Sequence, residues 1–143
     1  MPVLFDSSFY ITALRRGDAE LLQGRWLGDS PVWLSSVVIE ELYAGAKPGD
    51  LRILARLERD LSGANRTLTP NFKDWKRTGK VLARIGQKYG YEQIGRARLV
   101  NDALIAVSAA RIGVTLITAN QRDFAKLAEF CPLQWQARAS SGG

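Results

Sequence analysis

Short apolar stretches that alternate with helix-like segments are the feature that most constrains the fold of this chain. Three stretches, Val3–Phe5, 32–34 and 114–117, have the length and apolar character of buried strands. Strands that alternate with helices form parallel sheets covered on both faces, and such sheets carry their sites at the carboxyl ends of the strands. The sequence therefore predicts an α/β fold with three layers, in which a short central parallel sheet has helices on both faces.

Helical patterning accounts for most of the remaining sequence. Apolar spacing predicts helices over residues 7–14, 19–27, 36–44, 51–61, 72–89, 99–112 and 120–130. Ser35 or Ser36 and Asn71 are expected as caps at the start of two of these helices, and Gly113 at the end of another. Brief extended segments are expected at 66–69 and 133–135. All four tryptophans stand in apolar patterns and are expected in the core: Trp26, Trp33, Trp75 and Trp135. A chain of 143 residues, 46% of them apolar, predicts one domain over 1–137 followed by a loose polar tail at 138–143.

The composition excludes several classes of chemistry. The chain has no histidine, so a mechanism with imidazole as general base is excluded. A single cysteine, Cys131, excludes a disulfide framework and a multi-cysteine zinc site. The net charge of +6 favours a polyanionic partner such as nucleic acid, although many cytosolic domains are modestly basic. Because no charged leader or long apolar stretch is evident, we expect a cytoplasmic protein without a membrane segment.

Four carboxylates occupy positions where such a fold would gather them. Asp6 follows the first strand, Glu41 lies in the helix after the second, Asp102 opens the helix before the third, and Asp123 lies one turn beyond that strand. Gathered carboxylates repel one another and resist ionisation unless a cation lies among them. Oxygen ligands in an open site suit Mg²⁺, with Mn²⁺ as an alternative. We therefore expect these four residues to bind a divalent metal and to be catalytic, with Asp6 and Asp102 as the first ligands.

Each of these acids also has a simpler interpretation. Aspartate is a common helix cap, so Asp6, Asp102 and Asp123 could each be structural. The apolar run after Asp102 favours a functional role, because a charge at the mouth of such a run needs a partner. Glu41 lies on the apolar side of its helix, whereas its neighbour Glu40 shares a face with polar residues. We therefore expect Glu41 in the site and Glu40 in solvent.

Four short blocks resemble those of the PIN domain, and more narrowly of VapC-type toxin ribonucleases from prokaryotic toxin-antitoxin pairs. The blocks are Asp6-Ser7-Ser8, Glu41-Leu42-Tyr43-Ala44-Gly45, Asn101-Asp102-Ala103-Leu104-Ile105-Ala106 and Thr118-Ala119-Asn120-Gln121-Arg122-Asp123-Phe124. The resemblance covers nearly the whole chain. It implies that Asp6, Glu41, Asp102 and Asp123 form the acidic quartet, and that Ser8, Thr118 and Asn120 are supporting polar groups. The chain departs from the family at Ser7, where threonine is usual, and in its last block, where Asn120 lies nearer the strand than the acid.

The resemblance also implies a function and partners. It implies a magnesium-dependent endoribonuclease, the toxin of a type II pair, which binds a VapB-type antitoxin and forms a homodimer. Arg96 and Arg98 lie just upstream of Asp102 and are candidates to hold an RNA phosphate. The alternative is a noncatalytic nucleic-acid-binding module in which the acids are caps and the basic residues of the 72–89 helix bind the polyanion. A receiver-type domain is disfavoured, because no second acid follows Asp6 and no lysine follows the strand at 114–117.

Overall fold

A parallel sheet lies at the centre of the molecule. The structure is a computed structural model, and it describes residues 1–18, 22, 26–94 and 96–138. Strand β1 (Val3–Phe5) pairs in parallel with β3 (Ser30–Ser35) on one side and β5 (Thr115–Thr118) on the other. In this register Leu4 lies between Trp33 and Leu116. The predicted strands are confirmed, and their carboxyl ends lie at the same edge of the sheet.

Three short strands extend the sheet beyond this centre. Strand β6 (Trp135–Ala137) pairs in parallel with β5, and β4 (Thr67–Leu68) pairs in parallel with β3. Strand β2 (Trp26–Leu27) is antiparallel to β3. The strand order is therefore β2-β3-β1-β5-β6, with β4 attached to β3.

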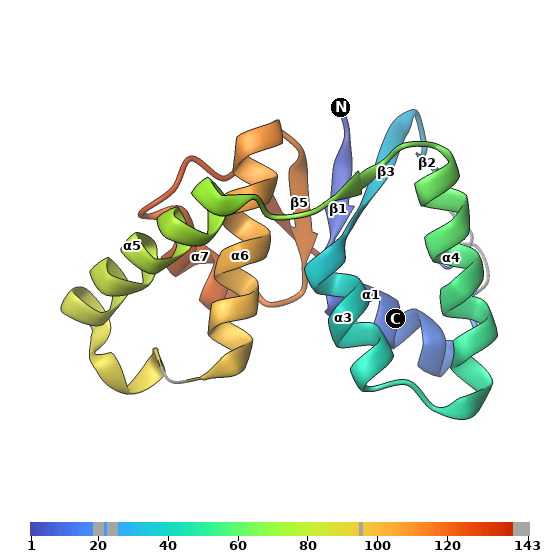
Figure 1. Cartoon of the computed structure of the whole chain (residues 1–143), viewed down its shortest axis with the longest axis horizontal. Helices are drawn as coiled ribbons and strands as arrows, with labels where there is room; N and C mark the ends of the chain where they lie inside the picture. The colour runs from blue at the N-terminus through green and yellow to red at the C-terminus, as the bar shows by residue number, and fades with distance from the viewer. Residues whose placement is uncertain (19–21, 23–25, 95, 139–143) are drawn as a thin grey trace.

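The helices fall into two groups with the sheet between them. Figure 1 shows α1 (Ser7–Arg16), α3 (Ser36–Ala44) and α4 (Leu51–Gly63) on the right, and α5 (Phe72–Tyr89), α6 (Ala97–Ile112) and α7 (Gln121–Ala128) on the left. Two short 3-10 turns, η1 (Pro48–Asp50) and η2 (Tyr91–Gln93), precede α4 and α6. The predicted α/β class, with a central parallel sheet and flanking helices, is confirmed. No helix among the described residues has the length and apolarity needed to cross a membrane.

Capping explains several of the helix boundaries. The Ser35 side chain accepts a hydrogen bond from the Val37 N–H at 3.1 Å and starts α3. Asn71 starts α5 by accepting from the Asp74 N–H at 2.8 Å. Gly113 ends α6 with a φ of 75°, a left-handed conformation that glycine adopts without strain. These three caps were predicted from the sequence.

The core is continuous from the sheet to the helices on either side. Its members include Leu4 and Leu116 in the strands, Leu54 and Leu57 in α4, and the alanine-rich centre of α6. In α6 the stretch from Ala103 to Ala109 is wholly buried, which lets α5 and α7 pack closely against it. Cys131 is buried as a small filler, as the sequence suggested.

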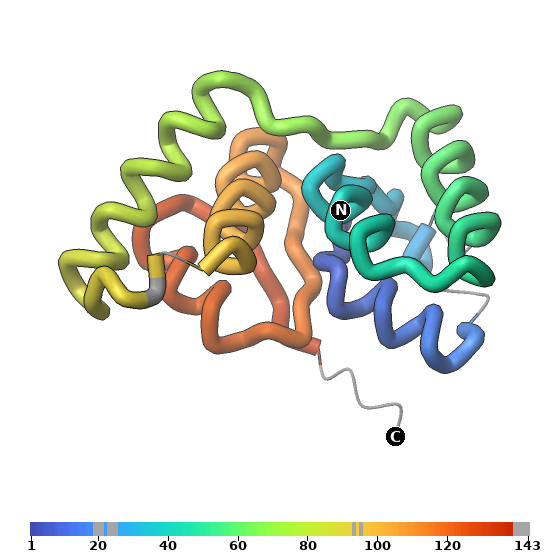
Figure 2. Tube along the Cα trace, turned by 60° about the horizontal axis from the view of Figure 1, so that its bottom comes forward, coloured from blue at the N-terminus to red at the C-terminus, as the bar shows by residue number. Residues whose placement is uncertain are grey.

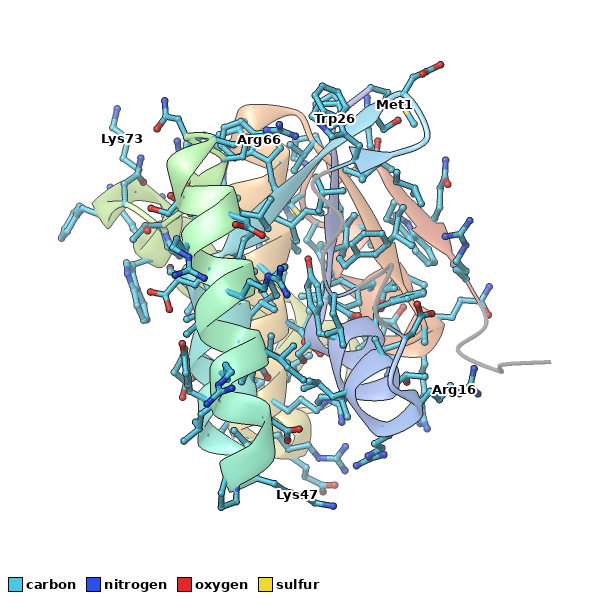
Figure 3. The ribbon with its side chains drawn as sticks, turned by 90° about the vertical axis from the view of Figure 1, so that its right-hand side faces the viewer. Met1, Arg16, Trp26, Lys47, Arg66 and Lys73 are labelled. Carbon is cyan, nitrogen blue, oxygen red and sulfur yellow. The ribbon has the colours of Figure 1, made fainter. Side chains whose placement is uncertain are left out.

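Two of the four tryptophans are not in the core. Trp26 and Trp75 are each 57% exposed, whereas Trp33 and Trp135 are partly buried and pack against the core. The Arg66 guanidinium lies over the Trp26 ring at 4.5 Å, and Figure 3 shows both residues beside one end of α4. Trp75 lies in the first turn of α5 outside its buried face. The expectation of a core role for these two residues was wrong, because apolar spacing in a helix or strand does not by itself show which face the neighbouring elements cover.

Other boundaries shift by a few residues. Trp26 and Leu27, predicted as the end of a helix, form a strand because they pair with the edge of β3. Residue 22 is helical, and the rest of that predicted helix (19–21 and 23–25) lies outside the described residues. The last strand begins at Trp135, where its backbone reaches β5, and not at Leu133. Of the predicted tail, 139–143 also lies outside the described residues, and the limits of the domain at 1–137 stay a prediction.

Candidate functional site

The four predicted acids come from four different elements near the carboxyl ends of β1 and β5. Asp6 directly follows β1, Glu41 lies in α3, Asp102 lies in α6, and Asp123 lies in the first turn of α7. Figure 2 shows α1 and α3 on one side of β5, and α6 and α7 on the other. The negative charges of Glu41, Asp6 and Asp123 all act on Asp102. The fold therefore brings the four positions into one electrostatic neighbourhood.

Asp6 is a buried carboxylate held by two hydroxyl groups. The residue is 3% exposed, and its backbone N–H donates to the Ile117 carbonyl at 3.2 Å, which fixes it against β5. The Ser8 hydroxyl donates to Oδ1 and the Thr118 hydroxyl donates to Oδ2, each at 2.5 Å. Burial raises the pKa of Asp6, and these hydrogen bonds oppose the rise. Ser8 and Thr118 thus both contact Asp6, and their supporting role in the site stays a prediction.

Asn120 connects the other acids on the α7 side. Its side-chain amide donates to Asp123 Oδ2 at 3.0 Å and to Asp102 Oδ2 at 3.3 Å. Its backbone N–H donates to the Thr118 hydroxyl at 2.9 Å, and that hydroxyl in turn donates to Asp6. One residue therefore links three carboxylates, directly or through Thr118. The sequence suggested Asn120 as a supporting group, and the structure shows that it is the hub of the hydrogen bonds.

Asp102 is the most strongly perturbed acid of the group. It lies within α6, which begins at Ala97 with Arg96 at its N-cap, so the expectation that Asp102 opens the helix was wrong and a capping role is excluded. The residue is 4% exposed. Burial, followed by repulsion from Glu41, Asp6 and Asp123, raises the pKa of Asp102 to about 8, and Arg98 opposes this. Without a cation, Asp102 is therefore mostly protonated at neutral pH.

Glu41 carries a buried oxygen that lacks a partner. Its Oε1 is buried and has no hydrogen-bond partner among the residues that the structure describes. Burial raises the pKa of Glu41, while Ser7, Asn101 and Arg98 act in the opposite direction. Its neighbour Glu40 is exposed. A buried carboxylate oxygen without a donor is costly, and a cation is one group that would satisfy it.

The chemistry of these side chains fits a divalent ion in an open site. Within the described part of the chain, no three acidic or thiol side chains gather closely enough to form a complete metal cage. Mg²⁺ does not need one, because it keeps several waters and is usually bound by one or two carboxylates with substrate phosphate. Buried oxygen donors, mutual repulsion and the orphaned Glu41 Oε1 are all features that such an ion would relieve.

Three neighbouring hollows lie beside the acids, and together we call them the groove because adjacent hollows share wall residues. The largest, about 510 Å³, has Ser8, Asn120, Asp123 and three arginines in its wall. A second, about 340 Å³, has Ser7 and Glu41 in its wall and shares Arg98 with the first. The third, about 410 Å³, shares Glu41 with the second. The predicted phosphate-binding residues Arg96 and Arg98 both line the largest hollow.

Arg122 is a residue of this groove that sequence reasoning did not select. It lies in the first turn of α7, between Asn120 and Asp123, and lines the largest hollow with Arg96 and Arg98. In the sequence it looks like any exposed arginine at the start of an amphipathic helix. Its position in the last of the four blocks was the only available signal.

The family model of the PIN domain matches residues 3–130 of this sequence. The chain belongs to the PIN domain family. The prediction made from the four blocks is therefore confirmed, and the match includes all four acids of the predicted quartet. PIN domains are generally nucleases, and PIN nucleases generally use divalent metal ions.

Solved structures of VapBC complexes have the same fold. A chain of VapBC-1 from nontypeable Haemophilus influenzae is 25% identical with a TM-score of 0.65, and the alignment covers 96% of this chain and 98% of that one. A chain of VapBC2 from Rickettsia felis, bound to a DNA fragment from its promoter, is 23% identical with a TM-score of 0.65, over 96% and 99%. A chain of VapBC-5 from Mycobacterium tuberculosis is 21% identical with a TM-score of 0.58, over 96% and 100%. No curated protein matches the sequence significantly.

Proposed function

We propose that this PIN domain is a metal-dependent endoribonuclease and the toxin of a type II toxin-antitoxin pair. The observation that carries the proposal is the group of carboxylates from four elements, of which Asp6 and Asp102 are buried and Glu41 and Asp123 are half-buried. Burial and the repulsion within this group raise the pKa of Asp102 to about 8, and the Glu41 Oε1 has no hydrogen-bond partner among the described residues. A fold tolerates such repulsion where a ligand of opposite charge compensates it.

In this proposal Asp6 and Asp102 hold Mg²⁺ or Mn²⁺, and Glu41 and Asp123 complete the site directly or through water. When bound, the ion lowers the pKa of a water and neutralises the developing charge on phosphate oxygens. Ser8 and Thr118 fix the orientation of the Asp6 carboxylate through their hydrogen bonds to its two oxygens. Because the chain contains no histidine, an imidazole base has no part in the reaction.

In this proposal Asn120 positions two of the carboxylates that bind the metal. Its amide donates to Asp102 and Asp123, so it holds two carboxylates at a separation that their charges alone would increase. Hydrogen bonds that orient metal ligands typically change metal affinity by about tenfold to a hundredfold. The resemblance to VapC-type toxins adds the products, a 5′ phosphate and a 3′ hydroxyl.

The proposed substrate is single-stranded or loop RNA in the cytoplasm. The backbone of an unpaired strand bends into a recessed site more readily than that of a duplex. Arg96 and Arg98 line the hollow beside the acids and supply positive charge to the phosphates. The net charge of +6 agrees with a polyanionic substrate.

We further propose a VapB-type antitoxin and a second copy of the chain as partners. The support is that the similar chains come from VapBC complexes. The exposed aromatic side chains of Phe72 and Trp75 at the start of α5, 82% and 57% exposed, provide apolar surface for a protein contact.

The decisive experiment compares Asp6→Asn with the control Glu40→Gln. Both remove one negative charge, but Asp6 is buried in the site and Glu40 is exposed beside it. RNA cleavage with Mg²⁺ should be lost in Asp6→Asn and in EDTA, and should persist in Glu40→Gln. Cleavage by Asp6→Asn in the presence of EDTA would refute the metal assignment.

A noncatalytic nucleic-acid-binding module remains the second candidate. The observation in its favour is that the basic side chains of α5 are exposed: Lys73, Arg77, Lys80, Arg84 and Lys88. This alternative predicts RNA binding that depends strongly on salt and not on magnesium, and no cleavage. Replacement of Lys73 and Lys80 with alanine would then abolish binding, whereas the nuclease proposal expects cleavage to continue.

A further inference from the structure

The largest hollow of the groove is strongly basic and opens beside the acids. Arg96 and Arg98 come from the start of α6, and Arg122 and Lys126 come from α7. Among the described residues of its wall Asp123 is the only acid, and the Asn120 amide donates to both Asp123 and Asp102. A hollow of about 510 Å³ with this charge suits an anion larger than a single water or halide.

The three arginines of this hollow are not neutralised by the protein. Among the described residues, none of the Arg96, Arg98 and Arg122 guanidinium groups has a hydrogen bond or an ion pair, although the charge of Arg98 reaches Glu41 and Asp102. Two cations elsewhere do have acidic partners: Arg111 pairs with Asp74, and Lys88 pairs with Glu129. Lys126 lies over the Tyr89 ring at 4.8 Å. Guanidinium groups bind phosphate oxygens with paired hydrogen bonds, so three free ones beside a nuclease site point to phosphate.

The other end of the groove has a different character. In the hollow of about 410 Å³, Arg15 and Lys47 are balanced by Glu41 and Asp50. Its wall also contains the apolar side chains of Ile11, Leu14 and Leu42. The charges of the described residues in this wall therefore balance, so the groove is electrostatically asymmetric about the acids.

We propose that the basic hollow is a phosphate-binding subsite in which Arg122, with Arg96 and Arg98, holds the RNA backbone on one side of the cleaved bond. The RNA backbone on the other side of the cleaved bond contacts no comparable group of positive charges. The protein therefore makes more ionic contacts with the RNA on one side of the cleaved bond than on the other. The phosphates on that side determine most of the ionic part of the binding affinity. This inference rests on the proposed ribonuclease function and adds to it a direction and a residue, Arg122.

The first test is the salt dependence of RNA binding in EDTA, which prevents cleavage. The matched variants are Arg122→Ala and Arg52→Ala. Arg52 is an exposed residue of α4, a helix that Figure 1 shows on the opposite side of the molecule from α6 and α7. For single strands, each lost phosphate contact lowers the slope of log affinity against log salt by about 0.7. Arg122→Ala should show this change and bind about tenfold more weakly at low salt, because hydrogen bonds to charged groups are among the strongest. Arg122→Lys should keep most of the slope, and Arg52→Ala should keep all of it.

The second test places neutral linkages in the substrate. It uses a short single-stranded RNA that the wild-type protein cleaves at one position. Two modified substrates carry methylphosphonate linkages, one on the 5′ side of that position and the other on the 3′ side. Neutral linkages on one side should slow cleavage about tenfold, and those on the other side should have little effect. In Arg122→Ala this difference between the two sides should shrink.

The outcomes separate this inference from the function on which it rests. If the wild-type protein cleaves no RNA in Mg²⁺, the proposed function fails. If it cleaves RNA but both sides of the substrate respond equally, or Arg122→Ala behaves like Arg52→Ala, only the subsite is refuted. Thermal unfolding of the variants detects a change in stability. If Arg122→Ala weakens RNA binding without changing the slope of log affinity against log salt, Arg122 has a structural role and the subsite is refuted.

Discussion

Two buried aspartates of this molecule have opposite environments. Asp74 in α5 is 3% exposed, and Asp102 in α6 is 4% exposed. The Arg111 guanidinium donates to both oxygens of Asp74 at 3.0 Å, and the Asn71 N–H donates to Oδ2 at 3.0 Å. Asp102 accepts from Asn120 at 3.3 Å and faces three other acids. The fold satisfies Asp74 internally and leaves Asp102 to be satisfied by a ligand.

This contrast separates a buried carboxylate that stabilises the fold from one that the fold leaves available for a ligand. A buried carboxylate that bonds to arginine and to a backbone N–H joins α5 to α6 and stabilises the fold. A buried carboxylate among its own kind reduces stability in the absence of a cation. The comparison predicts that the two aspartates respond in opposite ways to substitution.

The largest expected effect is the loss of activity in Asp102→Asn. The change keeps the shape of the side chain but removes a proposed metal ligand, so we expect RNA cleavage to fall by at least about a hundredfold. Stability without metal should be unchanged or higher, because asparagine is neutral in the folded protein without having to retain a proton. Cleavage rates with Mg²⁺ and thermal unfolding in EDTA measure the two effects. A destabilised Asp102→Asn protein would contradict the view that Asp102 is strained.

Asp74→Ala should have the opposite result. It leaves Arg111 without its carboxylate and removes half of the capping interaction with Asn71, so we expect a loss of about 2 kcal/mol in the free energy of unfolding. The partial exposure of Arg111 keeps this below the cost of breaking a fully buried pair. Urea unfolding measures the loss, with Asp29→Asn in the exposed turn before β3 as the control. Cleavage per folded molecule should stay near the wild-type level.

Asn120→Ala sharpens the comparison by changing only the supporting residue. The variant keeps the acids but removes the amide that holds Asp102 and Asp123 together. We expect about tenfold weaker activation by Mg²⁺, as for other residues that orient metal ligands. The readout is cleavage rate against Mg²⁺ concentration, where the half-saturating concentration rises and the maximal rate changes less. An unchanged half-saturating concentration would remove Asn120 from the metal site.

The sequence predicted Asp102 as a site residue but did not predict the ion pair of Asp74, because the first depends on a local signal and the second on a long-range contact. Strand alternation and the caps at Ser35, Asn71 and Gly113 depend on local rules, so they were predicted correctly. Asp102 was selected because an apolar run follows it, and this signal is also local. Arg111 is far from Asp74 along the chain, so their ion pair could not be read from spacing.

The same limit explains the other differences between prediction and structure. Strand β2 forms because its two residues meet β3, and no pattern of two residues specifies a strand. Trp26 and Trp75 are exposed because the neighbouring elements do not cover them. Arg122 acquires its place only when α7 lies beside the start of α6. Contacts between distant segments decide each of these cases.

Taken per pH unit, the smallest expected effect is the pH dependence of stability in EDTA. The folded-state pKa of Asp102, about 8, lies above its ordinary value of 3.8, so the folded protein retains a proton that the unfolded chain releases. Its contribution to stability is therefore complete below about pH 4 and is lost as the pH rises to about 8, by roughly 1 kcal/mol per pH unit. Asp102→Asn should flatten this fall, and Mg²⁺ should reverse it in the wild-type protein, because an ion stabilises the ionised form. A wild-type slope that survives Asp102→Asn would show that another group carries the proton, and the contrast between the two aspartates would then not hold.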